Sequence, residues 1–259
     1  MVIREFGDAG KPLIVLLPGM FCWWRGNFGG VLGGLERSFR VAVVSYSGFD
    51  EEEPDAAFDT VPNEVEQLER ALHQRYGERI RAVYGSSLGG LFAGLLMARK
   101  VMRFDRVILG STDLEHEGPL GARLKARHLA PTVYQLLHEG QPRSEKMREL
   151  MRHQLDDYPE LGPAVLRALG VGKRDMGFVK RVSIEHMLVS ALTTSLPRRV
   201  DVPGTEAHVL YATRMGEQYR ARYLRHFARP TIHELDLQHE ELLLCQPQRW
   251  LGLVEGICR

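Results

Sequence analysis

One short stretch constrains the fold of this 259-residue chain more than any other, Val83-Tyr84-Gly85-Ser86-Ser87-Leu88-Gly89-Gly90. The segment Arg81–Tyr84 predicts the end of a short buried strand, and the apolar residues of Leu88–Arg99 recur at the spacing of a helix. Ser87 has a glycine two positions away on each side. The pattern therefore indicates a strand that turns sharply into a helix at Ser87.

The two flanking glycines have a mechanical role in such a turn. A side chain at position 85 or 89 would collide with the neighbouring strand or helix, and the serine between them takes a strained backbone conformation. The serine hydroxyl then sits above the sheet at a helix N-terminus, where the helix dipole and the free amides favour negative charge. In this setting Gly-x-Ser-x-Gly is a nucleophile elbow, and the alternative is an ordinary turn with a serine N-cap.

Composition and charge exclude several classes of protein. Apolar residues make up 44% of the chain and the formal net charge is +1, so neither a nucleic-acid groove nor a polybasic membrane surface is expected. The three cysteines Cys22, Cys245 and Cys258 are scattered, which predicts no disulfide framework and no metal site. With no signal peptide and no apolar run near about 18 residues, we expect a soluble cytoplasmic protein without a cofactor.

Apolar segments with strand character occur along most of the chain and alternate with helical patterns. Such alternation predicts an α/β fold with a doubly wound, mostly parallel sheet. Seven segments have this strand character: Val2–Phe6, Leu13–Leu17, Val41–Tyr46, Arg81–Tyr84, Val107–Leu109, His208–Tyr211 and Thr231–Leu237.

The character of the chain changes between residues 114 and 204. Strand signals stop there, and helical patterns follow at about 120–139, 144–156, 160–169 and 176–195. We interpret 114–204 as a helical cap inserted after the sixth strand of a core that is formed by 1–113 and 205–259. An independent helical domain is the alternative, but the sheet needs the strands on both sides of this segment.

A serine nucleophile needs a base, and in chain order the base of an elbow serine comes last. His239 follows the strand Thr231–Leu237 and precedes a helix, which is the expected place for this histidine. We therefore predict that His239 is the general base of Ser87. The alternative is a solvated loop histidine.

The acid that orients the histidine is less well defined by the sequence. Glu217 is the first carboxylate after the strand ending at Ala212, so it is the first choice, although it could merely cap the following helix. Asp113, after the strand Val107–Leu109, is the alternative acid. Asp236 is a weaker third option.

Acyl transfer also requires donors for a developing oxyanion. The backbone N–H of Leu88 is one, and the loop Pro18-Gly19-Met20-Phe21 should supply the other, from Met20 or Phe21. Phe21, Trp23 and Trp24 could line an apolar substrate pocket there, or could pack against the cap or the sheet edge.

These motifs together resemble the α/β-hydrolase superfamily, including its helical-capped esterases and lipases. The resemblance is carried by Leu16–Met20, by Tyr84–Gly90 and by the loop of His239. It implies an eight-stranded, mostly parallel sheet with a helical cap over the serine. The chain departs from the family where Pro18-Gly19 replaces the common His-Gly and where Thr213–Glu217 replaces the usual Gly-x-x-Asp.

The leading functional hypothesis is a serine hydrolase that cleaves a small-molecule ester or thioester with a small, partly apolar acyl group. An acyltransferase or a C–C bond hydrolase would use the same Ser87, His239 and Glu217, and a ligand-binding protein with low turnover is a further alternative. The sequence leaves the oligomeric state open.

Overall fold

The computed structural model describes residues 1–172 and 176–259 and has a seven-stranded sheet at its centre. The strand order is β1-β3-β2-β4-β5-β6-β7, and β1 is antiparallel to β3 while the other pairs are parallel. The strands are β1 Val2–Phe6, β2 Leu13–Leu17, β3 Arg40–Ser45, β4 Arg79–Ser86, β5 Arg103–Gly110, β6 Glu206–Ala212 and β7 Thr231–Leu235.

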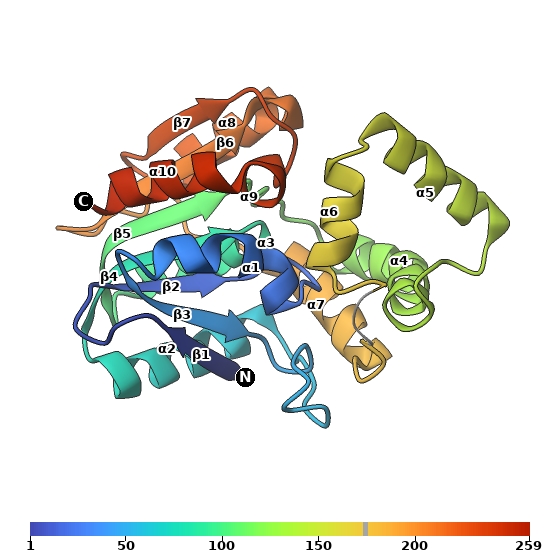
Figure 1. Cartoon of the computed structure of the whole chain (residues 1–259), viewed down its shortest axis with the longest axis horizontal. Coiled ribbons are helices and arrows are strands. Elements are labelled where there is room, and N and C mark those ends of the chain that lie inside the picture. The colour runs from blue at the N-terminus through green and yellow to red at the C-terminus, as the bar shows by residue number, and fades with distance from the viewer. Residues whose placement is uncertain (173–175) are drawn as a thin grey trace.

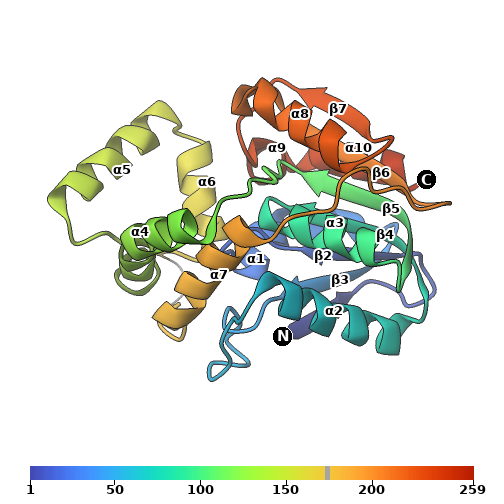
Figure 2. The same cartoon turned by 180° about the vertical axis from the view of Figure 1, so that it is seen from behind.

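Helices cover both faces of this sheet. On one face lie α1 and α10, and on the other lie α2, α3 and α8 (Figures 1 and 2). Their bounds are α1 Trp24–Leu35, α2 Val61–Tyr76, α3 Leu88–Arg99, α8 Glu217–His226 and α10 Pro247–Cys258. The doubly wound α/β fold predicted from the sequence is confirmed.

Strand β2 shows why the sheet is buried on both faces. Val15 and Leu17 belong to the core cluster that contains residues of α2 and α3, whereas Ile14 and Leu16 belong to the cluster of α1 and α10. Because successive side chains of a strand point to opposite faces, a continuously apolar strand needs a cover on each side.

The number of strands differs from the number that the family resemblance implied. All seven segments with strand character form the sheet, and the structure has seven strands rather than eight. The helical insert therefore follows the fifth strand, β5, and not the sixth. The eighth strand was implied by the resemblance, and no apolar segment of the sequence supplied it.

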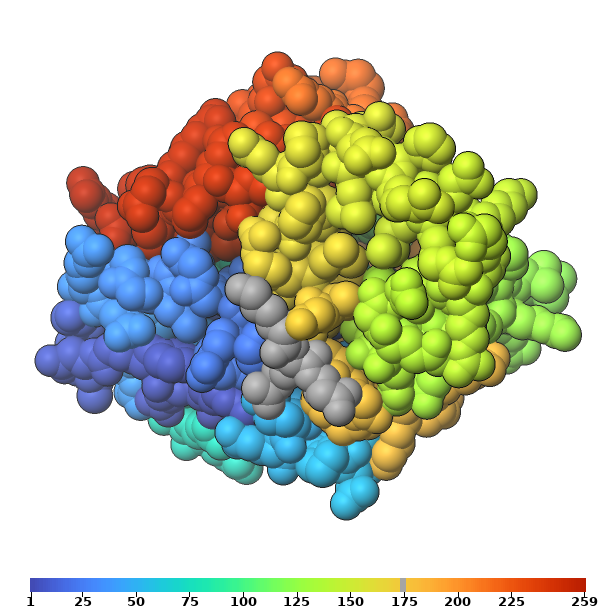
Figure 3. Space-filling view, turned by 45° about the vertical axis from the view of Figure 1, so that its right-hand side comes forward, coloured from blue at the N-terminus to red at the C-terminus, as the bar shows by residue number. Residues whose placement is uncertain are grey.

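Four helices connect β5 to β6. These are α4 Pro119–Glu139, α5 Glu145–Asp157, α6 Leu161–Ala168 and α7 Arg181–Thr193, and they lie beyond the carboxyl ends of the strands (Figure 1). In Figure 3 this insert, coloured green to gold, lies at the centre and right, beside the red C-terminal segment and the blue N-terminal part, which touch each other at the left. The domain boundaries at 113/114 and 204/205 stay a prediction, and residues 173–175 lie outside the described residues.

Helix α7 is fastened to the segment that leads into α2. The backbone N–H groups of Phe58 and Val61 donate hydrogen bonds to Ser183 Oγ (3.1 Å) and Ser190 Oγ (2.7 Å). His186 Nδ1 lies 3.1 Å from the carbonyl oxygen of Phe58. In contrast, α5 has no buried residue. The insert thus has one helix tied to the core and one packed only loosely.

The C-terminal segment, predicted as one helix over Glu240–Ile257, forms two. Helix α9 spans Glu241–Cys245 and α10 begins at Pro247. Proline disfavours helical backbone in the residue before it, and Gln246 accordingly has ψ 57°. Among the described residues, no helix is long and apolar enough to cross a membrane.

The burial of α3 leads to a prediction about stability. Leu96 is fully buried on α3, whereas Leu224 on α8 is 49% exposed. Leu96→Ala should lower the free energy of unfolding by about 2–5 kcal/mol, because it leaves a cavity in a packed core. Leu224→Ala, the matched control, should change it by less than about 0.5 kcal/mol. Urea denaturation measures both, and similar effects would contradict the packing described for α3.

Candidate active site

The turn between β4 and α3 has the geometry of a nucleophile elbow. Ser87 lies between the two elements with φ 47° and ψ −109°, a conformation that L-residues rarely adopt. A Cβ atom at Gly85 would overlap the backbone of Gly89, and one at Gly89 would overlap the carbonyl oxygen of Leu17. The collisions expected from the sequence are confirmed, so the glycines let α3 approach β2 and β4 closely.

The loop after β7 brings His239 to this serine. His239 Nε2 lies 3.1 Å from Ser87 Oγ, within hydrogen-bond distance. Ser87 is partly buried, and His239 is exposed. The two residues are far apart in the chain, and the sequence argument had selected both.

The loop that follows β2 lies against the elbow. A Cβ atom at Gly19 would come within 3.5 Å of Ser86 Oγ and 3.6 Å of Ser87 Cβ. In the part of the chain that the structure describes, the backbone N–H groups of Met20 and Leu88 donate no hydrogen bond. Both N–H groups are therefore available as donors. Their binding of an oxyanion stays a prediction.

The three predicted pocket aromatics lie in different packing environments, and their role in a substrate pocket stays a prediction. Phe21 is buried 6.0 Å from Phe49, ring centre to ring centre, in the core cluster of α2 and α3. Trp24 is buried in the other cluster, against Phe6 and with the guanidinium of Arg25 over its ring. Trp23 is half-buried and touches both clusters. Packing accounts for Phe21 and Trp24 without a substrate.

The three carboxylates predicted as candidates for the acid lie on the surface. Glu217 and Asp113 are exposed, and Asp113 Oδ1 accepts a hydrogen bond from the backbone of Glu115. Asp236 forms an ion pair with Arg214 at 2.9 Å, which lowers the pKa of Asp236. Within the described residues, no carboxylate is hydrogen-bonded to the ring of His239. The identity of the acid thus stays a prediction.

A buried carboxylate that the sequence argument missed lies next to His239. Glu240 Oε2 accepts a hydrogen bond from Ser86 Oγ at 2.6 Å, and the Glu240 N–H donates to Ser111 Oγ at 3.2 Å. Burial raises the pKa of this carboxyl group, while the charge of His239 and the hydrogen bond from Ser86 oppose the rise. In the sequence, the one feature that could have pointed to Glu240 as a site residue is its position directly after His239.

Ser86 also connects the elbow to the loop after β2. Asn27 on α1 accepts a hydrogen bond from Gly19 N at 2.9 Å through Oδ1, and its Nδ2 lies 3.5 Å from Ser86 Oγ. Asn27 is 4% exposed, so these bonds form away from solvent. Hydrogen bonds at such depth are costly to break because each unpaired partner stays buried.

Of the seven non-glycine residues with positive φ in the described part of the chain, four lie at the serine or in the loops around it. Phe21, Ser87, Ser111 and Glu240 all have positive φ, at 61°, 47°, 46° and 60°. Residues without a glycine's freedom adopt such angles only where the surrounding structure enforces them, and they cluster at functional sites. The concentration supports a functional role for this edge of the sheet.

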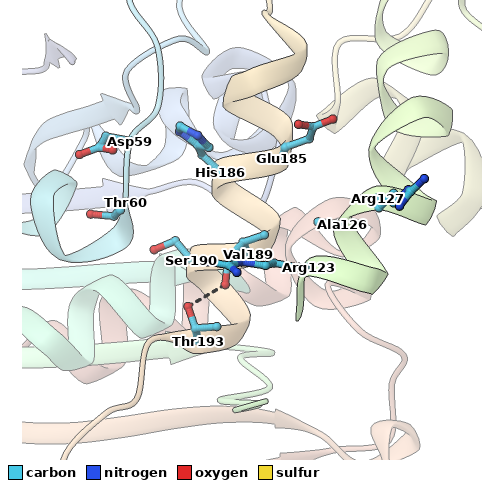
Figure 4. A pocket seen from close by; sticks show the side chains of 10 residues that line it. All are labelled: Asp59, Thr60, Arg123, Ala126, Arg127, Glu185, His186, Val189, Ser190 and Thr193. Carbon is cyan, nitrogen blue, oxygen red and sulfur yellow. Dashed lines mark hydrogen bonds between the residues drawn. The ribbon is translucent and has the colours of Figure 1, made fainter. Parts of the chain in front are cut away.

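A cavity of about 480 Å³ lies elsewhere, between α4, α7 and the start of α2 (Figure 4). Neither Ser87 nor His239 lines it. Two of its polar groups, those of His186 and Ser190, already hold α7 to Phe58 and Val61.

A smaller cavity of about 240 Å³ lies where the insert meets the loop of His239. The residues that line it include Gln238, Tyr158 and Arg214. The described residues contain no cluster of three or more side chains that could hold a metal ion.

The sheet is mostly parallel, and the elbow serine is within hydrogen-bond distance of a histidine from the loop after the last strand. These two features together define the class of α/β-type hydrolases. The family model for the α/β-hydrolase family matches residues 14–249. The chain belongs to this family and is a hydrolase. No curated protein sequence matches the chain.

Several solved structures share the fold at low sequence identity. An α/β-hydrolase family protein from Desulfitobacterium hafniense superposes with a TM-score of 0.79 at 20% identity, covering 100% of both chains. The enol-lactonase of Burkholderia xenovorans has a TM-score of 0.66 at 22% identity, over 99% of this chain and 95% of the enzyme. A thermophilic esterase from Thermogutta terrifontis has a TM-score of 0.71 at 16% identity, over 98% and 91%.

The close packing at the elbow predicts a sharp difference between two glycine substitutions. Gly89→Ala should lower the free energy of unfolding by about 1–3 kcal/mol, because the new methyl group overlaps the Leu17 carbonyl. Gly252→Ala on α10 has open space and should stabilise the helix by about 0.5–1 kcal/mol. Thermal unfolding compares them. Equal effects would show that α3 can move away from β2 at little cost.

Proposed function

We propose that this hydrolase cleaves esters or thioesters of small, partly apolar acyl groups through an acyl-enzyme on Ser87. The observation that carries the proposal is the 3.1 Å contact between His239 Nε2 and Ser87 Oγ at a strained elbow. Serine is a weak nucleophile at its own pKa, and a neighbouring imidazole is the usual group that activates it.

In the proposed first step, Ser87 Oγ attacks the carbonyl carbon of the substrate while His239 Nε2 takes the hydroxyl proton. The N–H groups of Met20 and Leu88 stabilise the oxyanion of the tetrahedral intermediate. When this intermediate collapses, the bond between carbonyl carbon and leaving group breaks, and His239 gives its proton to the alkoxide or thiolate.

In the proposed second step, a water molecule replaces the leaving group. His239 removes a proton from the water as its oxygen attacks the acyl carbon of the Ser87 ester, and a second tetrahedral intermediate forms. Its collapse releases the carboxylic acid and returns the proton from His239 to Ser87 Oγ. A lactone is a cyclic ester and would pass through the same intermediates.

The position of the insert supports a preference for partly apolar acyl groups. Helices α4–α7, the proposed cap, lie beyond the carboxyl ends of the strands, where ligands bind in open α/β sheets. Tyr134 of α4, Phe178 before α7 and Met20 of the oxyanion loop are partly buried and pack on the core cluster of α3. Apolar side chains therefore border this edge of the sheet.

Covalent labelling tests the nucleophile. A fluorophosphonate probe should label the wild-type protein, and Ser87→Ala should abolish both the labelling and the hydrolysis of a short acyl ester such as p-nitrophenyl butyrate. His239→Ala should slow labelling by about 10²-fold or more because Ser87 loses its base. Ser38→Ala, on the surface loop before β3, is the matched control and should label like wild type. Undiminished labelling of Ser87→Ala would refute the mechanism.

The acid is tested by a pair of isosteric changes. If Glu217 orients the histidine as the sequence predicted, Glu217→Gln should lower kcat by about 10³-fold or more, and Asp113→Asn should have little effect. The reverse pattern would assign the role to Asp113. Effects below about tenfold for both would show that neither exposed carboxylate is the acid, as expected if neither reaches the ring of His239. Steady-state rates on the same ester measure kcat.

A further inference from the structure

Glu240 is a buried carboxylate whose hydrogen-bonding capacity is only half used. It is 7% exposed, and its Oε2 accepts the Ser86 hydroxyl while Oε1 has no hydrogen-bond partner among the described residues. Burying a carboxylate with incomplete pairing is costly, so such a group needs a reason to persist. Glu240 also has a positive φ of 60°, which is a second unfavourable feature at the same position.

The position of this carboxylate ties it to both reacting residues. Glu240 directly follows His239, and its hydrogen-bond donor Ser86 directly precedes Ser87. The charge of His239 and the hydrogen bond from Ser86 both lower the pKa of the Glu240 carboxyl group against the effect of burial. The carboxylate therefore lies on the protein side of the serine–histidine pair, away from solvent.

The same carboxylate closes a chain of buried hydrogen bonds across the site. The chain runs from Gly19 N to Asn27, from Asn27 to Ser86 Oγ, and from Ser86 Oγ to Glu240. It joins the oxyanion loop, the elbow and the loop of His239. A shift of one loop would break a buried bond to the next, so the chain holds the three loops in register.

We propose that Glu240 is a positioning residue for the hydrolytic reaction: through Ser86 it fixes the elbow against the histidine loop, and its negative charge stabilises the protonated His239 formed when Ser87 attacks. This inference rests on the proposed function. It gives the electrostatic role of a triad acid to the residue beside the histidine, whereas the sequence placed that role after β6.

Several other titratable groups face Glu240, and each stays neutral near pH 7. Its charge acts on Cys22 of the oxyanion loop, on Tyr84 of β4 and on Tyr223 of α8. Burial raises the pKa of all three groups well above their ordinary values. Cys22, Tyr84 and Tyr223 therefore carry no charge that competes with the pairing of Glu240 and His239.

The test is the pH dependence of kcat/KM for Glu240→Gln, which keeps the shape of the side chain and removes its charge. We expect kcat to fall about tenfold or more, and the acidic limb of the profile to move to lower pH by about one unit, because the protonated imidazole loses a stabilising charge. KM should change little, since Glu240 does not touch the substrate. A merely structural residue would leave the acidic limb where it is.

Glu64→Gln is the matched control. Glu64, on α2, is also buried with one unpartnered carboxylate oxygen, and burial raises its pKa too. For both residues the pKa is higher in the folded protein, so the carboxyl group stabilises the fold at low pH, and this contribution is lost as pH rises through the folded pKa. Both Gln variants should therefore gain stability relative to wild type between about pH 4 and pH 7, and only Glu240→Gln should alter the acidic limb.

The outcomes separate this inference from the proposed function. If wild type reacts with the fluorophosphonate probe but the acidic limb of Glu240→Gln coincides with that of wild type, Glu240 is not a positioning residue and the serine mechanism stands. Absence of labelling in wild type would overturn both. If Glu240→Gln fails to fold, Ser86→Ala is the variant to test. It removes the hydrogen bond between the elbow and the Glu240 carboxylate, so the acidic limb should also move to lower pH, by less than the shift expected for Glu240→Gln. An unmoved limb there would also overturn the inference.

Discussion

The direct contact of backbone with backbone at Gly85 and Gly89 determines the rest of the site. Because no side chain separates α3 from β2 and β4, the chain must turn within one residue, and Ser87 takes the positive φ that this turn requires. This conformation places the hydroxyl at the edge of the sheet where the strands β2, β5 and β7 end and the loops after them begin. Each of these loops then meets the elbow at a fixed place, and His239 approaches Ser87 from the opposite end of the chain.

The buried charge of Glu240 near the elbow lowers the stability of the fold and, in the proposed role, assists the reaction. A glutamate without full pairing at a buried position costs stability, yet the same isolation from water strengthens its field at the neighbouring imidazole. Exposed carboxylates such as Glu217 and Asp113 are screened by solvent and act weakly unless they touch the ring. Glu240 is buried and its charge is less screened than theirs, which is the basis of the positioning role proposed for it.

The sequence predicted the parts of this protein that depend on local pattern. Bounds for Leu13–Leu17 and Leu88–Arg99 agree with the structure, and the contact between Ser87 and His239 followed from motif and chain order. The strand count was wrong by one because the eighth strand came from the family resemblance, and the insert follows the fifth strand of the sheet rather than the predicted sixth. The link from Ser86 to Glu240 was not predictable, since it joins residues 154 positions apart and no local pattern marks a buried glutamate.

The insert divides into a part that the fold depends on and a part that it does not. Helix α7 accepts backbone hydrogen bonds from Phe58 and Val61 and buries one of its faces, so changes there disturb the core. Helix α5 buries no residue, and its composition is nearly free of folding constraints. Substitutions in α5 should therefore be tolerated by the fold more readily than substitutions in α7, so this helix is the part of the insert whose sequence can vary most while the sheet and the elbow stay unchanged.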